Sequence, residues 1–176
     1  MALRRSKPSL KQIFEARPPQ SILVIRTDRV GDLILSTPFL QSLREQFPRA
    51  DITAWVAPYC EQILESTGLV NRIATSLPSG HFDLAISLAP RSESLKNALA
   101  SAAPTRVGYI YTDRPLVRVL ARRCLTHCEL IKVAAPDHLE HEVEHLDKLA
   151  RTMGLPPVAN RPLTLGMRFK TKDWLV

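Results

Sequence analysis

Hydrophobic residues fall into short continuous runs that alternate with longer segments of helical periodicity. The clearest run is Ile-Leu-Val-Ile at residues 22–25, which is typical of a strand covered on both faces. Apolar residues then recur at helical spacing over residues 33–47, and Pro38 is expected to bend the start of that helix. Alternation of this kind predicts a parallel sheet with helices on both sides.

The same alternation continues along the chain. Further apolar runs predict strands at residues 52–57, 72–76, 84–88 and 106–110, and helical patterns predict helices at 58–66, 92–103, 115–124 and 139–153. Gly68 and Gly154 stand where glycine commonly ends a helix. We therefore predict an α/β fold, a Rossmann-like parallel sheet with helices on both faces, formed by residues 21–157.

Both ends of the chain differ from this pattern. Residues 1–20 begin basic and lack the apolar stretch of a secretory signal. Leu10, Ile13 and Phe14 are spaced for one short helical turn, but a mobile basic arm is the preferred interpretation. Residues 158–176 follow two prolines and are expected to be a linker with the truncated start of a missing second domain. No run reaches the roughly 18–20 apolar residues of a membrane span.

Composition narrows the possible partners. Apolar residues make up 45% of the chain, enough for a packed core, and the formal net charge of +7 favours an anionic partner. Aromatic residues are only 6% and no nucleic-acid-binding motif is present, so no nucleic acid is expected as a partner. An odd number of cysteines without a CxxC pair indicates free thiols in a reducing compartment.

The turn after the first strand is the first candidate for chemistry, because ligands of α/β proteins bind at the carboxyl ends of strands. It contains one glycine, Gly31, and neither GxGxxG nor a phosphate-binding loop, which argues against a dinucleotide. Asp32 has two interpretations: a helix N-cap, or an ionised carboxylate that serves as a general base. Taken alone, the residues of this turn slightly favour the N-cap role for Asp32.

Basic residues occur in two settings. Arg91 and Lys96 follow the fourth predicted strand, on the same sheet edge as Asp32, and are candidates to bind an anionic acceptor or are ordinary surface charges. Arg118, Arg122 and Arg123 lie on the predicted helix 115–124, whose other positions are apolar. Such a helix fits either an anionic lipid surface or the solvated face of a packed helix.

Residues 141–145 match the HExxH pattern of zinc peptidases letter for letter. A catalytic zinc site needs a third protein ligand, and no His or Glu follows His145, while His138 lies on the same helix face. The helical wheel places His141 and His145 away from the apolar stripe, in solvent or at a cleft edge. Cys124 and Cys128 with His127 between them are an equally poor ligand set, so no metal site is predicted.

Three segments in this order resemble glycosyltransferase family 9, the ADP-heptose:lipopolysaccharide heptosyltransferases. Residues 22–56 resemble the family's opening strand, Gly-Asp turn, helix with an early Thr-Pro, and second strand. Residues 82–109 resemble its Asp-containing strand, Arg-Ser helix start and Arg-Val-Gly-Tyr strand, and residues 141–155 resemble a helix that begins with His. The resemblance spans about residues 21–165 and accounts for the HExxH match, since only His141, Val143 and Glu144 belong to the family pattern.

The resemblance implies the N-terminal half of a GT-B enzyme, in which two Rossmann-like domains face each other across a cleft. This half would bind the acceptor, the lipopolysaccharide inner core on lipid A, and the other half the ADP-heptose donor, with no metal and no cofactor. Asp32 would be the general base of an inverting transfer, and the acceptor would contact Thr27, Arg29, Gly31, Arg91 and Lys96.

The family members are about twice as long as this chain. The chain is therefore expected to be a fragment, a truncated product or half of a split enzyme, and to transfer no sugar alone. We expect a cytoplasmic location, peripheral on the anionic cytoplasmic face of the inner membrane, with the basic helix residues Arg118, Arg122 and Arg123 facing the lipid. The alternative is a non-catalytic Rossmann-like module that binds an anionic membrane surface or a partner protein.

Overall fold

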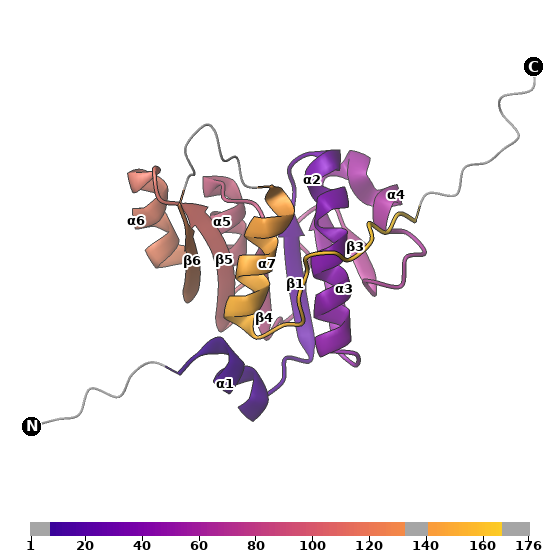
Figure 1. The fold of residues 1–176 in the computed structure, drawn as a ribbon, viewed down its shortest axis with the longest axis horizontal. Coiled ribbons are helices and arrows are strands. Elements are labelled where there is room, and N and C mark those ends of the chain that lie inside the picture. The colour runs from indigo at the N-terminus through magenta and orange to yellow at the C-terminus, as the bar shows by residue number, and fades with distance from the viewer. Residues whose placement is uncertain (1–7, 133–140, 167–176) are drawn as a thin grey trace, which may run out of the picture.

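A six-stranded parallel sheet in the order β3-β2-β1-β4-β5-β6 forms the centre of the molecule (Figure 1). The structure is a computed structural model and describes residues 8–132 and 141–166. The strands are β1 (Ser21–Arg26), β2 (Asp51–Val56), β3 (Arg72–Ala74), β4 (Leu84–Ser87), β5 (Thr105–Tyr111) and β6 (His127–Ile131). The predicted α/β fold class, a Rossmann-like parallel sheet with helices on both faces, is confirmed.

Helices cover both faces of this sheet. They are α1 (Leu10–Ala16), α2 (Val30–Leu35), α3 (Thr37–Gln46), the 3-10 turn η1 (Pro58–Cys60), α4 (Glu61–Leu64), α5 (Ser92–Ala100), α6 (Pro115–Cys124) and α7 (Glu142–Met153). On β1, Ile22 and Val24 belong to the core shared with α3 and α7, whereas Leu23 and Ile25 belong to the core shared with α5 and α6. Both faces of β1 are therefore buried, which explains its uninterrupted apolar run.

Several elements differ from the sequence prediction; the helix expected over residues 58–66, for example, is the 3-10 turn η1 followed by the short α4. The helix expected over residues 33–47 is divided into α2 and α3. Pro38 has no N–H to donate to the carbonyl of Ile34, and the hydroxyl of Thr37 donates to that carbonyl instead, at 2.8 Å. Strand β6 was not predicted, because it is a half-exposed edge strand with a mixed polar and apolar sequence.

The expectation that residues 1–20 form a mobile arm is wrong for α1. Ser9 and Gln12 form a capping box at the start of α1, and Leu10 and Phe14 are buried. The ring of Phe14 packs edge-on against Phe47, with centroids 5.5 Å apart. The short helical turn considered above is therefore the conformation that this segment adopts, because it buries two large apolar side chains.

The chain after α7 is also more closely attached than a linker. We call residues 156–166 the strap; it crosses α3 and ends beside α4 (Figure 1). The carboxylate of Asp147 accepts the backbone N–H groups of Val158 and Ala159, at 2.8 and 3.2 Å. The Gln41 amide donates to the strap, and Val158 is fully buried. Residues 158–166, which were expected to be a linker, therefore pack against this domain as far as Gly166.

Among the residues that the structure describes, no helix is long and apolar enough to cross a membrane.

Candidate active site

A polar pocket of about 160 Å³ lies at the carboxyl ends of β1, β4 and β5. From β1 the chain moves to β2 and β3 on one side, and β4 then pairs with β1 on the other side. The pocket thus lies at the topological switch point, where open α/β sheets bind ligands. Its lining residues are Arg26, Asp28, Asp32, Pro90, Arg91, Tyr111, Arg114 and Glu142.

Arg26 is the buried centre of this pocket. It continues the alternation of Ile22 and Val24, so that its side chain lies on the α7 face of the sheet, and only 2% of it is exposed. Its Nη1 donates to the carbonyl of Leu88, and its Nη2 lies 2.8 Å from Glu142 Oε1. Burial acts to lower the pKa of Arg26, but the acidic groups around it, Tyr109, Asp28 and Glu142, outweigh burial and raise the pKa.

Glu142, the first residue of α7, connects Arg26 to an aromatic cluster. Its Oε1 also accepts from the hydroxyl of Tyr109, at 2.6 Å. Its Oε2 lies 3.6 Å from Nδ1 of His145, which in turn lies 3.4 Å from the hydroxyl of Tyr111. Burial and the neighbouring charge of Glu142 raise the pKa of both tyrosines, which keeps them protonated as hydrogen-bond donors.

Asp32 is the more accessible of the two aspartates in the pocket. It is the third residue of α2; the N-cap position belongs to Arg29, and α2 has no side-chain cap hydrogen bond. The N-cap interpretation of Asp32 is therefore wrong. Its carboxylate is 32% exposed, and Oδ1 lies 3.8 Å from Arg26 Nη2, beyond hydrogen-bond distance. A hydroxyl group of a ligand in the pocket can reach such a carboxylate.

Asp28 differs from Asp32 in its surroundings. Its side chain is only 6% exposed, and Oδ1 lies 3.1 Å from Arg26 Nε. Burial and the charge of Asp32 raise the pKa of Asp28, and Arg26 partly opposes this rise. The hydroxyl of Tyr59 donates to the Asp28 carbonyl at 2.6 Å and fixes the turn from the β2 side.

Two arginines form the outer rim of the pocket. Arg91 follows β4 and is the N-cap residue of α5, and Arg114 precedes α6. The Arg114 guanidinium lies over the ring of Tyr111, 5.4 Å from the centroid. Since Arg26 is engaged by carboxylates, Arg91 and Arg114 are the lining arginines that face an incoming anion.

The structure brings together two of the predicted site residues, Asp32 and Arg91. Thr27, Arg29 and Gly31 belong to the adjoining turn and first helical residues without lining the pocket. Lys96 is exposed on α5 and also lies outside the lining; its charge acts on Cys124 of α6.

The sequence analysis did not identify the other residues that line the pocket. Arg26 and Asp28 could have been found, because they directly follow the apolar run of β1 and so stand at the carboxyl end of a strand.

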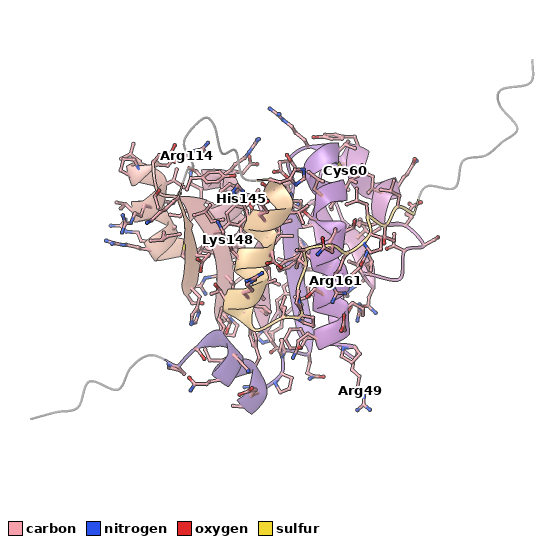
Figure 2. The ribbon with its side chains drawn as sticks, viewed as in Figure 1. Arg49, Cys60, Arg114, His145, Lys148 and Arg161 are labelled. Atoms are coloured by element: carbon pink, nitrogen blue, oxygen red, sulfur yellow. The ribbon has the colours of Figure 1, made fainter. Side chains whose placement is uncertain are left out.

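The remaining sequence predictions concern α6 and metals. Arg118, Arg122 and Arg123 are exposed on α6. His141 is the N-cap of α7, and its Nδ1 accepts from the N–H of Val143. His145 lies on α7 (Figure 2), where it is buried and packs edge-on against Tyr111, a residue of the pocket lining; of its two expected positions, solvent or a cleft edge, the structure supports the second. Within residues 8–132 and 141–166, no three His, Cys, Asp or Glu side chains are grouped to hold a metal ion, and His138 lies outside these ranges. All three cysteines are free.

A second pocket, of about 420 Å³, lies at the opposite edge of the sheet beside α1. Three prolines contribute to its lining, and the carboxylate of Asp83 is engaged there by the backbone N–H groups of Gln20 and Ser21. The smaller pocket is the stronger candidate for chemistry, because its accessible aspartate and rim arginines converge on one space.

The fold defines a Rossmann-like domain with a polar site at its switch point. A glycosyl transferase family 9 structure from Veillonella parvula DSM 2008 matches with a TM-score of 0.67 at 20% identity, over 85% of this chain and 45% of that chain. E. coli heptosyltransferase WaaC with ADP matches with a TM-score of 0.63 at 19% identity, over 80% and 49% of the two chains. E. coli ADP-heptose lps heptosyltransferase II matches with a TM-score of 0.57 at 21% identity, over 84% and 46%.

The predicted structural resemblance to family 9 glycosyltransferases is confirmed at the level of the fold. This chain spans about half the length of these structures. No protein-family model matches the chain, and no curated protein matches it.

Proposed function

We propose that this chain is the acceptor-binding half of an inverting, metal-independent heptosyltransferase. The observation that carries the proposal is the half-exposed carboxylate of Asp32, which lies at the switch point beside a buried Arg26 and two rim arginines. The fold shared with heptosyltransferases, one of them solved with ADP, supports the same assignment. ADP-heptose is the donor, bound by a domain outside this chain.

In this mechanism Asp32 acts as a general base. It accepts the proton of an acceptor hydroxyl while the hydroxyl oxygen attacks the anomeric carbon of the donor sugar. The bond between that carbon and the diphosphate oxygen breaks, and ADP leaves with the electron pair. Attack from the face opposite ADP inverts the anomeric configuration.

The acceptor is the lipopolysaccharide inner core, whose phosphate and carboxylate groups suit two arginines. Arg91 and Arg114 bind such an anion at the rim, because a guanidinium pairs with oxyanions in two parallel hydrogen bonds. Thr27, Arg29 and Gly31 lie outside the pocket lining but adjoin Asp32 in the turn, so we assign them contacts with the neighbouring sugar. Lys96 also lies outside the lining and belongs to α5 rather than to this turn, so it is left out of the site.

The test has two arms. In the first, the 176-residue chain is titrated with deacylated inner-core oligosaccharide by calorimetry; wild type and Asp32→Asn bind equally, and Arg91→Ala with Arg114→Ala abolishes binding. No binding by wild type refutes the acceptor-binding role. In the second, the chain is fused to a donor-binding domain and transfer is followed by mass spectrometry. Asp32→Asn lowers kcat by roughly 10²–10⁴-fold; an unchanged kcat refutes the base role.

A second candidate function, docking on an anionic membrane surface, has its own support in α6. Leu116 is 84% exposed and Val119 is 57% exposed, beside the exposed Arg118, Arg122 and Arg123. Apolar side chains within a basic helix face fit the boundary of anionic lipid headgroups. Such docking places the acceptor pocket near a lipid-linked acceptor on the cytoplasmic face of the inner membrane, so both functions are compatible.

A further inference from the structure

Nη2 of Arg26 faces two competing carboxylates. It lies 2.8 Å from Glu142 Oε1 and 3.8 Å from Asp32 Oδ1. The remainder of the guanidinium is held in place, because Nη1 donates to the Leu88 carbonyl and Nε lies 3.1 Å from Asp28 Oδ1. The choice between the two carboxylates therefore depends on their own side chains, and not on movement of Arg26.

Glu142 is better placed than Asp32 to pair with Nη2 of Arg26. It stands in the first turn of α7, and the hydroxyl of Tyr109 donates to the same oxygen that pairs with Arg26. Asp32 is more exposed and stands in the first turn of α2. With Glu142 neutral, Nη2 loses its ionic partner, and about 1 Å of side-chain movement brings Asp32 into hydrogen-bond distance of it.

Whether Asp32 pairs with Arg26 determines how readily its carboxylate accepts a proton. A carboxylate in a charge-assisted hydrogen bond with arginine is stabilised in its ionised form, and it accepts a proton less readily. We propose that Glu142 is a positioning residue that engages Arg26 and so leaves Asp32 free to accept the acceptor proton. This inference rests on the proposed role of Asp32 as the base. Asp28, Arg91 and Arg114 complete the charged groups around it.

The proposal is tested in the 176-residue chain by carboxyl labelling. The protein is treated with a water-soluble carbodiimide and glycine methyl ester, and peptide mass spectrometry compares labelling of Asp32 with that of the exposed Glu93 on α5. In Glu142→Gln the rate at Asp32 falls about fivefold relative to Glu93, because Asp32 pairs with Arg26. Glu142→Asp, which keeps the charge, restores most of the rate.

Glu144→Gln is the matched control. It removes a carboxylate from the same turn of α7, but Glu144 is exposed and does not line the pocket, so that Asp32 is labelled at the wild-type rate. A wild-type rate at Asp32 in a folded Glu142→Gln protein overturns the proposal. If that variant does not fold, hydrogen-bond couplings measured by NMR in the wild type decide: Arg26 Nη2–H must couple to the Glu142 carboxylate, and coupling to Asp32 overturns the proposal.

The labelling readout needs no sugar transfer, so failure of this inference and failure of the proposed function are distinguishable. If Asp32→Asn transfers normally, Asp32 is not the base, and labelling still shows whether Glu142 controls Arg26. In the fused protein, Glu142→Gln is expected to lower kcat with the KM for the acceptor unchanged. An equal loss in kcat/KM through KM alone contradicts the positioning role.

Discussion

At the scale of single residues, a buried charge can hold a neighbouring segment of backbone in place. Asp147 illustrates it away from the pocket: its carboxylate accepts two backbone N–H groups of the strap and pairs with Arg151 at 2.7 Å. Burial alone would raise the pKa of Asp147, but the hydrogen bonds from Val158, Ala159 and Arg151 lower it. The ionised form is therefore favoured more in the folded protein than in the unfolded chain.

This linkage gives a pH-dependent prediction for Asp147→Asn. At pH 7 the variant is expected to be less stable than wild type by about 2 kcal/mol, because hydrogen bonds to an ionised acceptor are lost. The contribution of Asp147 is complete above the unfolded pKa of about 3.9 and is lost as pH falls through the lower folded value. Urea unfolding at pH 7 and pH 3 measures it: the difference shrinks at pH 3. Glu15→Gln, in an exposed pair with Lys11, is the control with little effect.

At the scale of elements, the face of α6 away from the sheet is the least covered apolar surface described above. Its hydrophobic residues Leu116 and Val119 point outward, whereas Ala121 and Cys124 pack inward. The exposed arginines of α6 lie on the same helix, so the element has both parts of an interfacial helix.

Binding to lipid vesicles tests this surface. The chain is expected to sediment with phosphatidylglycerol vesicles and not with phosphatidylcholine vesicles. Arg118→Gln with Arg122→Gln weakens binding at least about tenfold, at about 1 kcal/mol for each charge near the surface. The matched control removes two exposed arginines elsewhere, Arg17→Gln with Arg49→Gln; Arg49 lies at the opposite end of the molecule from Arg114 (Figure 2). Equal losses in the two double variants contradict a specific α6 surface.

Prediction of the elements from sequence succeeded where periodicity was strong. β1 and α6 have uninterrupted apolar or amphipathic patterns, and both were located within a residue or two. β6 was not predicted, because an edge strand is only half covered. α1 was expected to be mobile, because its burial depends on Phe47, which is more than thirty residues away in the sequence.

Prediction of the site from sequence was limited in the same way. Asp32 and Arg91 follow from the position of strand ends, but Glu142 joins Arg26 across 116 residues, which no local pattern reveals.

At the scale of the whole molecule, positive charge is unevenly distributed between the pocket and the rest of the surface. The chain carries a formal net charge of +7, yet the pocket is lined by as many arginines as carboxylates. The excess positive charge is therefore outside the pocket, where it attracts polyanions over longer distances and is screened by salt.

Association kinetics test this separation. For the proposed acceptor, an anionic inner-core oligosaccharide, the association rate is expected to fall about tenfold between about 20 mM and 200 mM salt, because surface charge steers the encounter. Stopped-flow fluorescence or surface plasmon resonance measures the rate, and a neutral oligosaccharide of similar size serves as the control. A rate independent of salt for the anionic ligand contradicts the steering role.

Helix α7 supports both the pocket and the strap. Glu142 pairs with Arg26 at its first turn, and Asp147 binds the backbone of the strap five residues later, about 7.5 Å along the helix axis. Because a helix transmits displacement along its axis with little deformation, the two attachments are not mechanically independent. A displacement of the strap at Val158 therefore shifts α7 as well, and with it the distance between Arg26 Nη2 and Glu142 Oε1.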